Sequence, residues 1–407
     1  GWNPDSFGHN WQLPQILKKA GLDYYVFERC APEKTAVFWW EGLDGSRVLA
    51  YVPPGWYLVN LKQGARDIVL QASNGTPLKN FMLLYGEGDH GGGPRDTDIE
   101  AILRFRDDEN QPRLEFVTPE AYFKKLEGLN LTLPVIKQEL NFTFPGCYTT
   151  QVETKKANRR LENLLLQAEK FSSLAFMCGY RDYYPERDID EAWKIVLQNQ
   201  FHDILDGSSI GPVYEEARAS YEDAEVQAER ALDFSLKTIA SMVDTRGPGL
   251  PLIVFNSLFW ERTEPVVSEV FYSRPVQAIR ILDSKGAEIP SQVLSMRSEG
   301  DQWRVRFAFI AEDVPSFGYK TYRVLESRTQ PAYKTSLLGS STTAENEFFK
   351  ITIDESRGWM KSLFDKKNNR EFLSAPANIL QAIADEPDQM SAWAVSYTHL
   401  TLPTNRE

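Results

Sequence analysis

The chain has 407 residues, of which 42% are hydrophobic and 25% charged. This is the balance of a globular protein rather than of a disordered or collagen-like one. Its 45 Lys and Arg against 57 Asp and Glu give a net charge of −12. That charge argues against a nucleic-acid binder or an anionic-membrane binder, since both need a basic surface. No apolar stretch approaches the roughly 18 residues of a membrane span, and the length predicts two or three domains.

The first part of the chain alternates short apolar runs with helical patterns. Its predicted elements are, in order, a helix near 13–20 stopped by Gly21, strands at 24–27, 36–40 and 47–52, an apolar run at 79–85, and a helix over 96–106. Strands that alternate with helices predict a parallel α/β layer, in which functional residues gather at the carboxyl ends of the strands.

The remainder divides into a helical and a β-rich region. Apolar residues at three- and four-residue spacing predict three antiparallel helices within 151–243, with breaks around 183–187 and 206–212. The segment TRGPGLP is a predicted linker because of its Gly and Pro content. Beyond it, LIVFN, WRVRFAFIA and FFKITI predict strands, with turns at DSKG and DESRG. We therefore expect a partial antiparallel β-domain there.

Both ends of the sequence differ from its interior. The chain begins with Gly1 rather than Met and starts inside an apparent motif, so we expect an internal fragment. Residues 396–407, SYTHLTLPTNRE, have no periodicity and resemble the translated read-through of a sequencing adapter. They are expected to be a non-native tail. Three scattered cysteines do not form a disulfide framework, and they favour a reducing, cytoplasmic location.

The segment WNPDSFGHN (residues 2–10) carries a candidate catalytic carboxylate, Asp5, between Pro4 and Gly8. A strand end followed by these residues predicts a carboxylate at the head of a helix. There it would ligate a metal or act as a nucleophile. The alternative is a helix N-cap Asp, which composition alone favours.

The segment GEGDHGGGP (residues 86–94) is a second candidate, because so many glycines after the strand predicted at 79–85 allow the backbone to approach a ligand closely. Besides Glu87, only Asp89 and His90 in it can exchange protons. The alternative is a surface turn. A phosphate-binding loop is disfavoured, since no Lys-Ser/Thr pair follows.

The third motif is NQFHDILDGSSIG (residues 199–211), which places His202 late in a predicted helix with an otherwise apolar face. A lone helical histidine is more often structural than a metal ligand. Asp203, next to it, is predicted either to orient the imidazole or to contact the ligand itself.

Together, these motifs resemble the retaining α-mannosidases of glycoside hydrolase family 38. The family's order is kept by PDSFGHNWQLPQILKKAG, FERC, WEGLDGSRVLAY, GEGDHGGGP, GCYTTQ and NQFHDILDGSSI, and the resemblance covers about residues 1–393. DEPDQMSAWA is similar to the family's next β-domain element. The resemblance implies a multidomain α/β, α and β protein. Its parts would be a truncated β/α barrel-like catalytic domain, a three-helix domain, a partial β-sandwich-like domain and the tail (1–135, 136–244, 245–395 and 396–407).

The resemblance also implies a zinc-dependent retaining hydrolase that acts on terminal α-D-mannosyl residues of oligosaccharides or mannosides. Asp5 matches the residue that is both nucleophile and zinc ligand. His202 matches the zinc-ligand histidine of the helical domain. Arg29, in FERC, matches an active-site arginine that contacts substrate.

The general acid/base is implied within the glycine-rich segment, at Asp89 with His90 as the alternative. Tyr57 and Asp203 are implied to contact the substrate. Retention requires two carboxyl groups roughly 5–5.5 Å apart. Zinc would hold the 2- and 3-hydroxyls of the sugar as a template and electrostatic clamp.

Two departures from the family pattern affect these expectations. The family's other zinc ligands, a His-x-Asp pair, lie upstream of the PDxFG motif, and this sequence begins there. Half of a four-ligand site predicts poor zinc binding and little activity for the chain as written. Asp206, in DILDG, stands where the resemblance implies Pro.

Two other functional classes remain open. A metal-dependent carbohydrate deacetylase would release acetate rather than mannose. A non-catalytic mannose-binding protein would bind sugar without turnover, whether or not Asp5 is replaced. The sequence leaves open the linkage preference and whether the chain forms a homo-oligomer.

Overall fold

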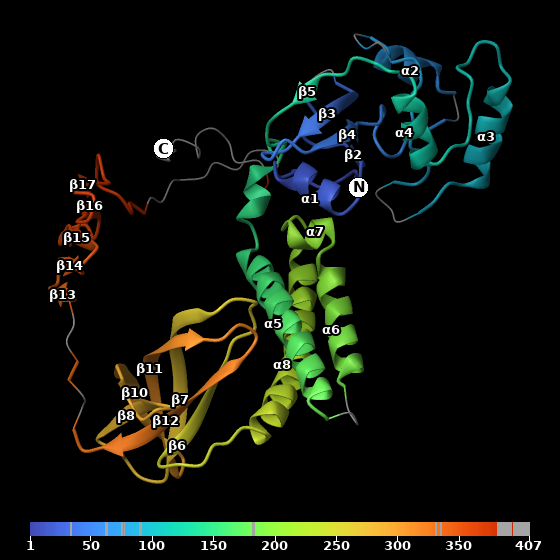
Figure 1. The fold of residues 1–407 in the computed structure, drawn as a ribbon. Coiled ribbons are helices and arrows are strands. Elements are labelled where there is room, and N and C mark those ends of the chain that lie inside the picture. The colour runs from blue at the N-terminus through green and yellow to red at the C-terminus, as the bar shows by residue number, and fades with distance from the viewer. Residues whose placement is uncertain are drawn as a thin grey trace. The chain divides into compact units, whose positions relative to one another are not determined.

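The structure is a computed structural model that describes residues 1–32, 35–61, 64–74, 76, 78–88, 92–180, 184–329, 332–333, 336–380 and 393. The chain divides into two compact units. Figure 1 labels its helices and strands and colours them along the chain. The first unit comprises 1–160, 194–222 and 386–407, and the second comprises 161–193 and 223–385. Each is described by itself. No helix within the described ranges is long and apolar enough to cross a membrane.

The first unit contains a five-stranded mixed sheet in the order β1-β2-β4-β3-β5. Its strands are β1 (Trp2–Asn3), β2 (Tyr24–Phe27), β3 (Val37–Glu41), β4 (Arg47–Tyr51) and β5 (Val135–Ile136). β1, β2 and β4 are parallel, whereas β3 runs antiparallel to β4. The predicted strands are confirmed, but a barrel-like arrangement is not, since these described strands form an open sheet.

Apolar side chains cover both faces of this sheet, as expected when nearly every strand residue is buried. One face packs Phe27, Phe38 and Trp40 together with Leu17 of α1. The other packs Tyr51 with Tyr122 of α4, among others. The helices of this part are α1 (Leu13–Lys19), α2 (Arg66–Ala72), α3 (Asp96–Arg106), α4 (Pro119–Glu127) and a short 3-10 helix (Pro145–Tyr148).

Two predictions in this region are confirmed and one is wrong. Helix α1 ends before Gly21, which has φ 77°, a conformation that glycine adopts without strain, and α3 spans the predicted residues. The apolar run at 79–85 forms no strand. Instead, an isolated parallel bridge joins Tyr85 to Val59, because the run packs mainly through side chains such as Met82 and Leu84 against the α4 face of the sheet.

The predicted three helices are α5 (Val152–Met177), α6 (Glu186–Asn199) and α8 (Gly211–Ser241), with the four-residue α7 (His202–Leu205) between the last two. His202 therefore opens a separate short helix, and the prediction that it lies late in the second helix is wrong. Phe201 is extended (ψ 137°), so the helical path is broken between α6 and α7.

The second unit carries three antiparallel sheets, ordered β10-β11-β7, β6-β12-β8-β9 and β13-β14-β15-β16-β17. The first two share one core, built around Phe307, Phe309 and Tyr322. Burial alternates along their strands, most clearly in β11, as it does where two sheets pack face to face. The strands are β6 (Leu250–Phe255), β7 (Arg262–Tyr272), β8 (Ala278–Asp283), β9 (Glu288–Ile289), β10 (Ser291–Glu299), β11 (Gln302–Val314), β12 (Tyr319–Ser327), β13 (Leu338–Gly339), β14 (Thr343–Glu345), β15 (Phe349–Ile353), β16 (Met360–Asp365) and β17 (Arg370–Glu371).

Candidate active site

Three predicted site residues follow the carboxyl ends of the three parallel strands. Asp5 comes two residues after β1, Arg29 two residues after β2, and Tyr57 in the loop after β4. Parallel strands deliver such residues to one edge of the sheet, where α/β proteins bind ligands. Asp5 lies in a loop rather than at a helix head. Its N-cap alternative is wrong too, because α1 begins at Leu13 with Gln12 at its N-cap.

Three side chains converge on the carboxylate of Asp5, which is only 14% exposed. The guanidinium of Arg29 donates through Nε to Oδ1. The hydroxyl of Tyr57 donates to Oδ2 at 3.2 Å, and Nε2 of His202 lies 3.2 Å from the same oxygen. These contacts hold the carboxylate in one orientation, and a small part of it remains exposed. Four of the predicted site residues are thus brought together.

Arg29 is itself held among aromatic rings. Its guanidinium carbon lies 4.8 Å from the ring centre of Phe7, 4.9 Å from that of Trp56 and 5.6 Å from that of Phe144. Cation–π contacts of this kind hold a guanidinium without using up its donors. Trp56 has φ 68° although it is not glycine, which is a strained conformation for a bulky residue, and it remains 38% exposed. Sequence reasoning did not find this aromatic surround.

His9 holds the backbone of Arg29 in place through a hydrogen bond to its carbonyl. It is buried, and burial lowers the pKa of its imidazole to about 4. The ring is therefore neutral at pH 7: Nε2 donates to the carbonyl of Arg29 at 3.1 Å, and Nδ1 accepts from the hydroxyl of Tyr25 at 2.7 Å. The only sequence signal for His9 was its place in the PDSFGHN motif. Its buried, structural role becomes apparent only from the fold.

Asp203 lies beside His202, with Oδ2 3.5 Å from Nε2 of the imidazole. The Ser208 hydroxyl donates to its other oxygen at 2.8 Å. The hydroxyls of Ser209 and Tyr214 donate to its backbone carbonyl at 2.9 and 3.1 Å. The carboxylate is 41% exposed. This position allows Asp203 to orient His202 or to accept from a ligand hydroxyl.

The glycine-rich segment approaches the same site. A Cβ added at Gly88 would lie 2.7 Å from Cβ of Leu58 and 3.0 Å from the ring of Tyr57, so a glycine is needed there. Tyr57 in turn donates to Asp5. Asp89 and His90, the predicted acid/base and its alternative, lie outside the described residues.

Glu28 is a buried carboxyl that sequence reasoning missed. It precedes Arg29 at the end of β2, is 8% exposed, and its Oε1 has no hydrogen-bond partner among the described residues. Burial raises its pKa to about 8, so it carries a proton at neutral pH. In the sequence FERC, Glu28 stands between a predicted strand and an arginine. From the sequence alone, a glutamate in such a position is expected to be exposed.

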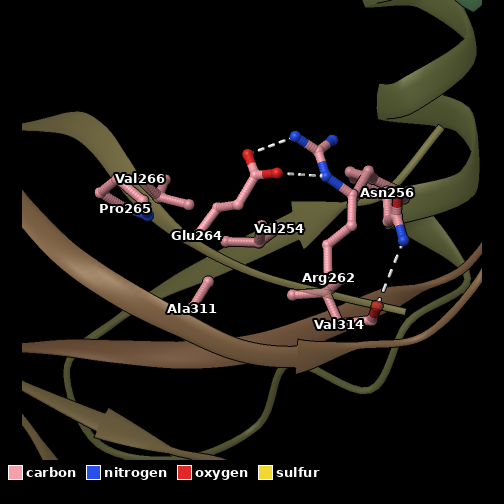
Figure 2. Close-up of a pocket in the computed structure, with 9 residues that line it drawn as sticks. Val254, Asn256, Arg262, Glu264, Pro265, Val266, Ala311 and Val314 are labelled. Carbon is pink, nitrogen blue, oxygen red and sulfur yellow. Dashed lines mark hydrogen bonds and ion pairs between the residues drawn. The ribbon is translucent and has the colours of Figure 1, made fainter. Parts of the chain in front are cut away.

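The second unit contains a small pocket that differs from this site in its lining (Figure 2). Its volume is about 80 Å³, well below the roughly 300 Å³ of ordinary ligand sites. Its polar groups are satisfied: Arg262 pairs with Glu264, and the Asn256 amide donates to the carbonyl of Val314 at 3.2 Å. The pocket is therefore a gap between the sheets of the sandwich.

Comparison with known proteins decides the family. The models for the glycosyl hydrolases family 38 N-terminal domain, the alpha mannosidase middle domain and the glycosyl hydrolases family 38 C-terminal domain match residues 1–146, 143–239 and 344–407, in that order. The chain belongs to glycoside hydrolase family 38.

Individual members of the family show the same similarity. Alpha-mannosidase 2C1 of Homo sapiens is 29% identical over 98% of this chain and 36% of its own length. The alpha-mannosidase of Saccharomyces cerevisiae is 32% identical over 66% of this chain and 26% of its own length. A putative mannosylglycerate hydrolase of Halalkalibacterium halodurans is 24% identical over 63% of the chain. The chain spans about a third of the length of the curated relatives it matches.

The fold is also that of solved family 38 structures. An alpha-mannosidase from Enterococcus faecalis superposes with a TM-score of 0.72 at 20% identity, covering 91% of this chain and 48% of that one. A second family 38 protein from the same organism gives 0.65 at 19% identity. These likenesses establish the mixed α/β architecture.

Tyr57→Phe tests the role of the phenol. Removing a hydrogen bond to a charged group costs about 1.5–3 kcal/mol. We therefore expect kcat for an α-mannoside to fall about 10-fold or more, while the thermal unfolding midpoint falls by no more than several degrees. Tyr24→Phe, which loses only a surface hydrogen bond to Glu127, is the matched control. Equal kcat in both variants would exclude Tyr57 from the chemistry.

Proposed function

We propose that this chain carries the catalytic centre of a zinc-dependent retaining α-mannosidase that removes terminal α-D-mannosyl residues from oligosaccharides or mannosides. The observation that carries the proposal is the convergence of Arg29, Tyr57 and His202 on the Asp5 carboxylate. Family membership supports it, and several relatives are named alpha-mannosidases.

In the proposed reaction, Asp5 attacks the anomeric carbon and forms a glycosyl–enzyme ester. Asp89 protonates the leaving oxygen, then removes a proton from the water that hydrolyses the ester. Arg29 and Tyr57 hold the Asp5 carboxylate in one orientation. The same orientation then serves both the attack on the sugar and the hydrolysis of the ester. The ring of Trp56 lies against the guanidinium of Arg29 and is partly exposed.

Asp5 and His202 would hold the zinc ion, and their donor atoms fit it. Two ligands at zinc's usual distance and tetrahedral angle lie about 3.3 Å apart, close to the 3.2 Å between Oδ2 and Nε2. Zinc would supply a template for sugar hydroxyls. Within the described ranges, no cluster of three or more His, Cys, Asp or Glu completes such a site. Metal analysis of the purified protein, compared with His202→Ala, tests this assignment.

The deciding experiment follows the anomeric proton by NMR while the protein acts on an aryl α-D-mannoside. Release of α-mannose before mutarotation supports the proposal, and first release of the β-anomer excludes retention. Acetate released from an acetylated sugar instead would indicate a deacetylase. Mannose binding without turnover, unaffected by Asp5→Asn, would indicate a sugar-binding protein.

A further inference from the structure

The thiol of Cys30 contacts two other segments of the chain. Cys30 is buried, at 3% exposure, and follows Arg29 directly. Its sulfur lies 3.3 Å from the carbonyl oxygen of Phe7 and 3.0 Å from the hydroxyl oxygen of Thr143, and its single proton is donated to one of them at a time. The same sulfur accepts the backbone N–H groups of Phe142 and Thr143, at 3.3 and 3.2 Å.

Each of the three segments that meet at this sulfur contributes to the surroundings of Asp5. Phe7 belongs to the loop that carries Asp5, and Arg29 donates to the Asp5 carboxylate through Nε. In the third segment, the ring of Phe144 meets that of Phe7 edge-on, with centres 5.3 Å apart. The centre of the Phe144 ring also lies 5.6 Å from the guanidinium carbon of Arg29. The Cys30 sulfur therefore joins the carboxylate loop, the arginine and one of the rings that hold the arginine.

The segment of residues 140–144 is also fixed to the Asp5 loop independently of Cys30. The His9 N–H donates to the carbonyl of Leu140 at 2.7 Å, and the Leu140 N–H donates to the carbonyl of His9 at 3.1 Å. A Cβ added at Gly8 would lie 2.8 Å from Cγ of Asn141, so the two segments pack too closely for a side chain there. The sulfur extends this contact from residues 8 and 9 to Phe7, towards Asp5.

We propose that Cys30 is a positioning residue, whose sulfur holds the Asp5 loop and the 140–144 segment at the end of β2 and so keeps the Asp5 carboxylate aligned with Arg29. Cys30 has φ 60°, a conformation that glycine adopts without strain and cysteine does not. What cysteine contributes at this position is therefore its side chain. The kinetic consequences rest on the proposed function, since alignment changes a rate only if Asp5 reacts.

The test compares Cys30→Ser, which keeps a donor and an acceptor, with Cys30→Ala and Cys30→Gly, which remove both. The glycine variant also relieves the strained φ, so it separates loss of the sulfur from loss of stability. Hydroxyl O–H···O bonds are about 2.7–2.8 Å long, shorter than the sulfur contacts, so we expect serine to restore most of them but not all. Cys178→Ala makes the same change at an exposed cysteine and is the matched control.

Two readouts need no activity. Hydrogen exchange on peptides covering residues 138–148 reports the two amides that donate to the sulfur. NMR measurement of the exchange of the Arg29 Nε proton with water reports its bond to Asp5, and the signal is identified by its absence from Arg29→Lys. We expect both exchange rates to rise about 10-fold in the Ala and Gly variants and to stay within about 3-fold of wild type in the Ser and Cys178→Ala variants.

Kinetics with an aryl α-D-mannoside give the third readout. The Ala and Gly variants should lose about 10-fold in kcat with little change in KM, and the Ser variant should recover most of it. Unchanged exchange of the Arg29 Nε proton in the Ala and Gly variants, or a Ser variant as impaired as they are, would overturn the inference. An inactive wild-type protein with the expected exchange pattern would support the inference and count against the proposed function alone.

Discussion

Asp5→Asn is expected to lower α-mannoside hydrolysis by roughly 10⁴-fold or more, since an amide cannot form the glycosyl ester. The amide keeps the shape of the carboxylate. Its oxygen can still accept from Arg29, and its NH₂ group can donate to the Tyr57 hydroxyl, so the fold should persist. Asp107→Asn, at the exposed end of α3, is the matched control. Circular dichroism and initial rates on the two variants give the comparison.

A chemical rescue sharpens this prediction. In Asp5→Gly the nucleophile is gone, and the space it leaves admits azide. Azide would then attack the face that Asp5 occupied, displace the leaving group and give the β-mannosyl azide, which NMR identifies. Formation of this product assigns the nucleophile to Asp5. A variant that retains more than a few per cent of wild-type activity without azide would place the nucleophile elsewhere.

Glu28→Gln is expected to stabilise the protein at neutral pH by about 3 kcal/mol. The native state holds the proton up to about pH 8, whereas the unfolded chain releases it near pH 4.5. Below pH 4.5 both states are protonated, and Glu28 costs nothing. Between pH 4.5 and 8 the unfolded state is favoured increasingly as pH rises, so the native protein loses stability with pH. Glutamine mimics the protonated acid and removes this dependence.

Denaturant unfolding at pH 4, 6 and 8 measures the effect. The free energies of unfolding of wild type and Glu28→Gln should agree at pH 4 and diverge as pH rises. Glu109→Gln, in the exposed turn after α3, should differ from wild type by less than about 0.5 kcal/mol at every pH. A constant difference across the three pH values would mean that Glu28 is ionised in the native protein.

The strand and helix predictions succeeded where a local pattern decides the structure. The buried strands at β2, β3 and β4, the helix α3 and the alternating β11 are each specified by their own apolar period. The run at 79–85 failed because an apolar stretch is equally satisfied by packing against α4. His202 was misplaced because the extended backbone at Phe201 separates α6 from α7, and the spacing of apolar residues does not reveal this break.

The sequence alone also singled out residues of the candidate site. Motif order singled out Asp5, Arg29, Tyr57 and His202, and the structure brings these four together. The roles of nucleophile, zinc ligand and acid/base remain proposals. A motif match carries residue identity but no distances.

Tertiary structure decided everything that depends on burial and on contacts between distant segments. It gave the rings around Arg29, the neutral His9 packed against that residue's backbone, and the buried proton of Glu28. None of these features is marked by a periodic pattern or a fixed spacing of residues in the sequence. A carboxyl group or an imidazole changes its chemistry only when the fold removes water and sets a particular neighbour beside it.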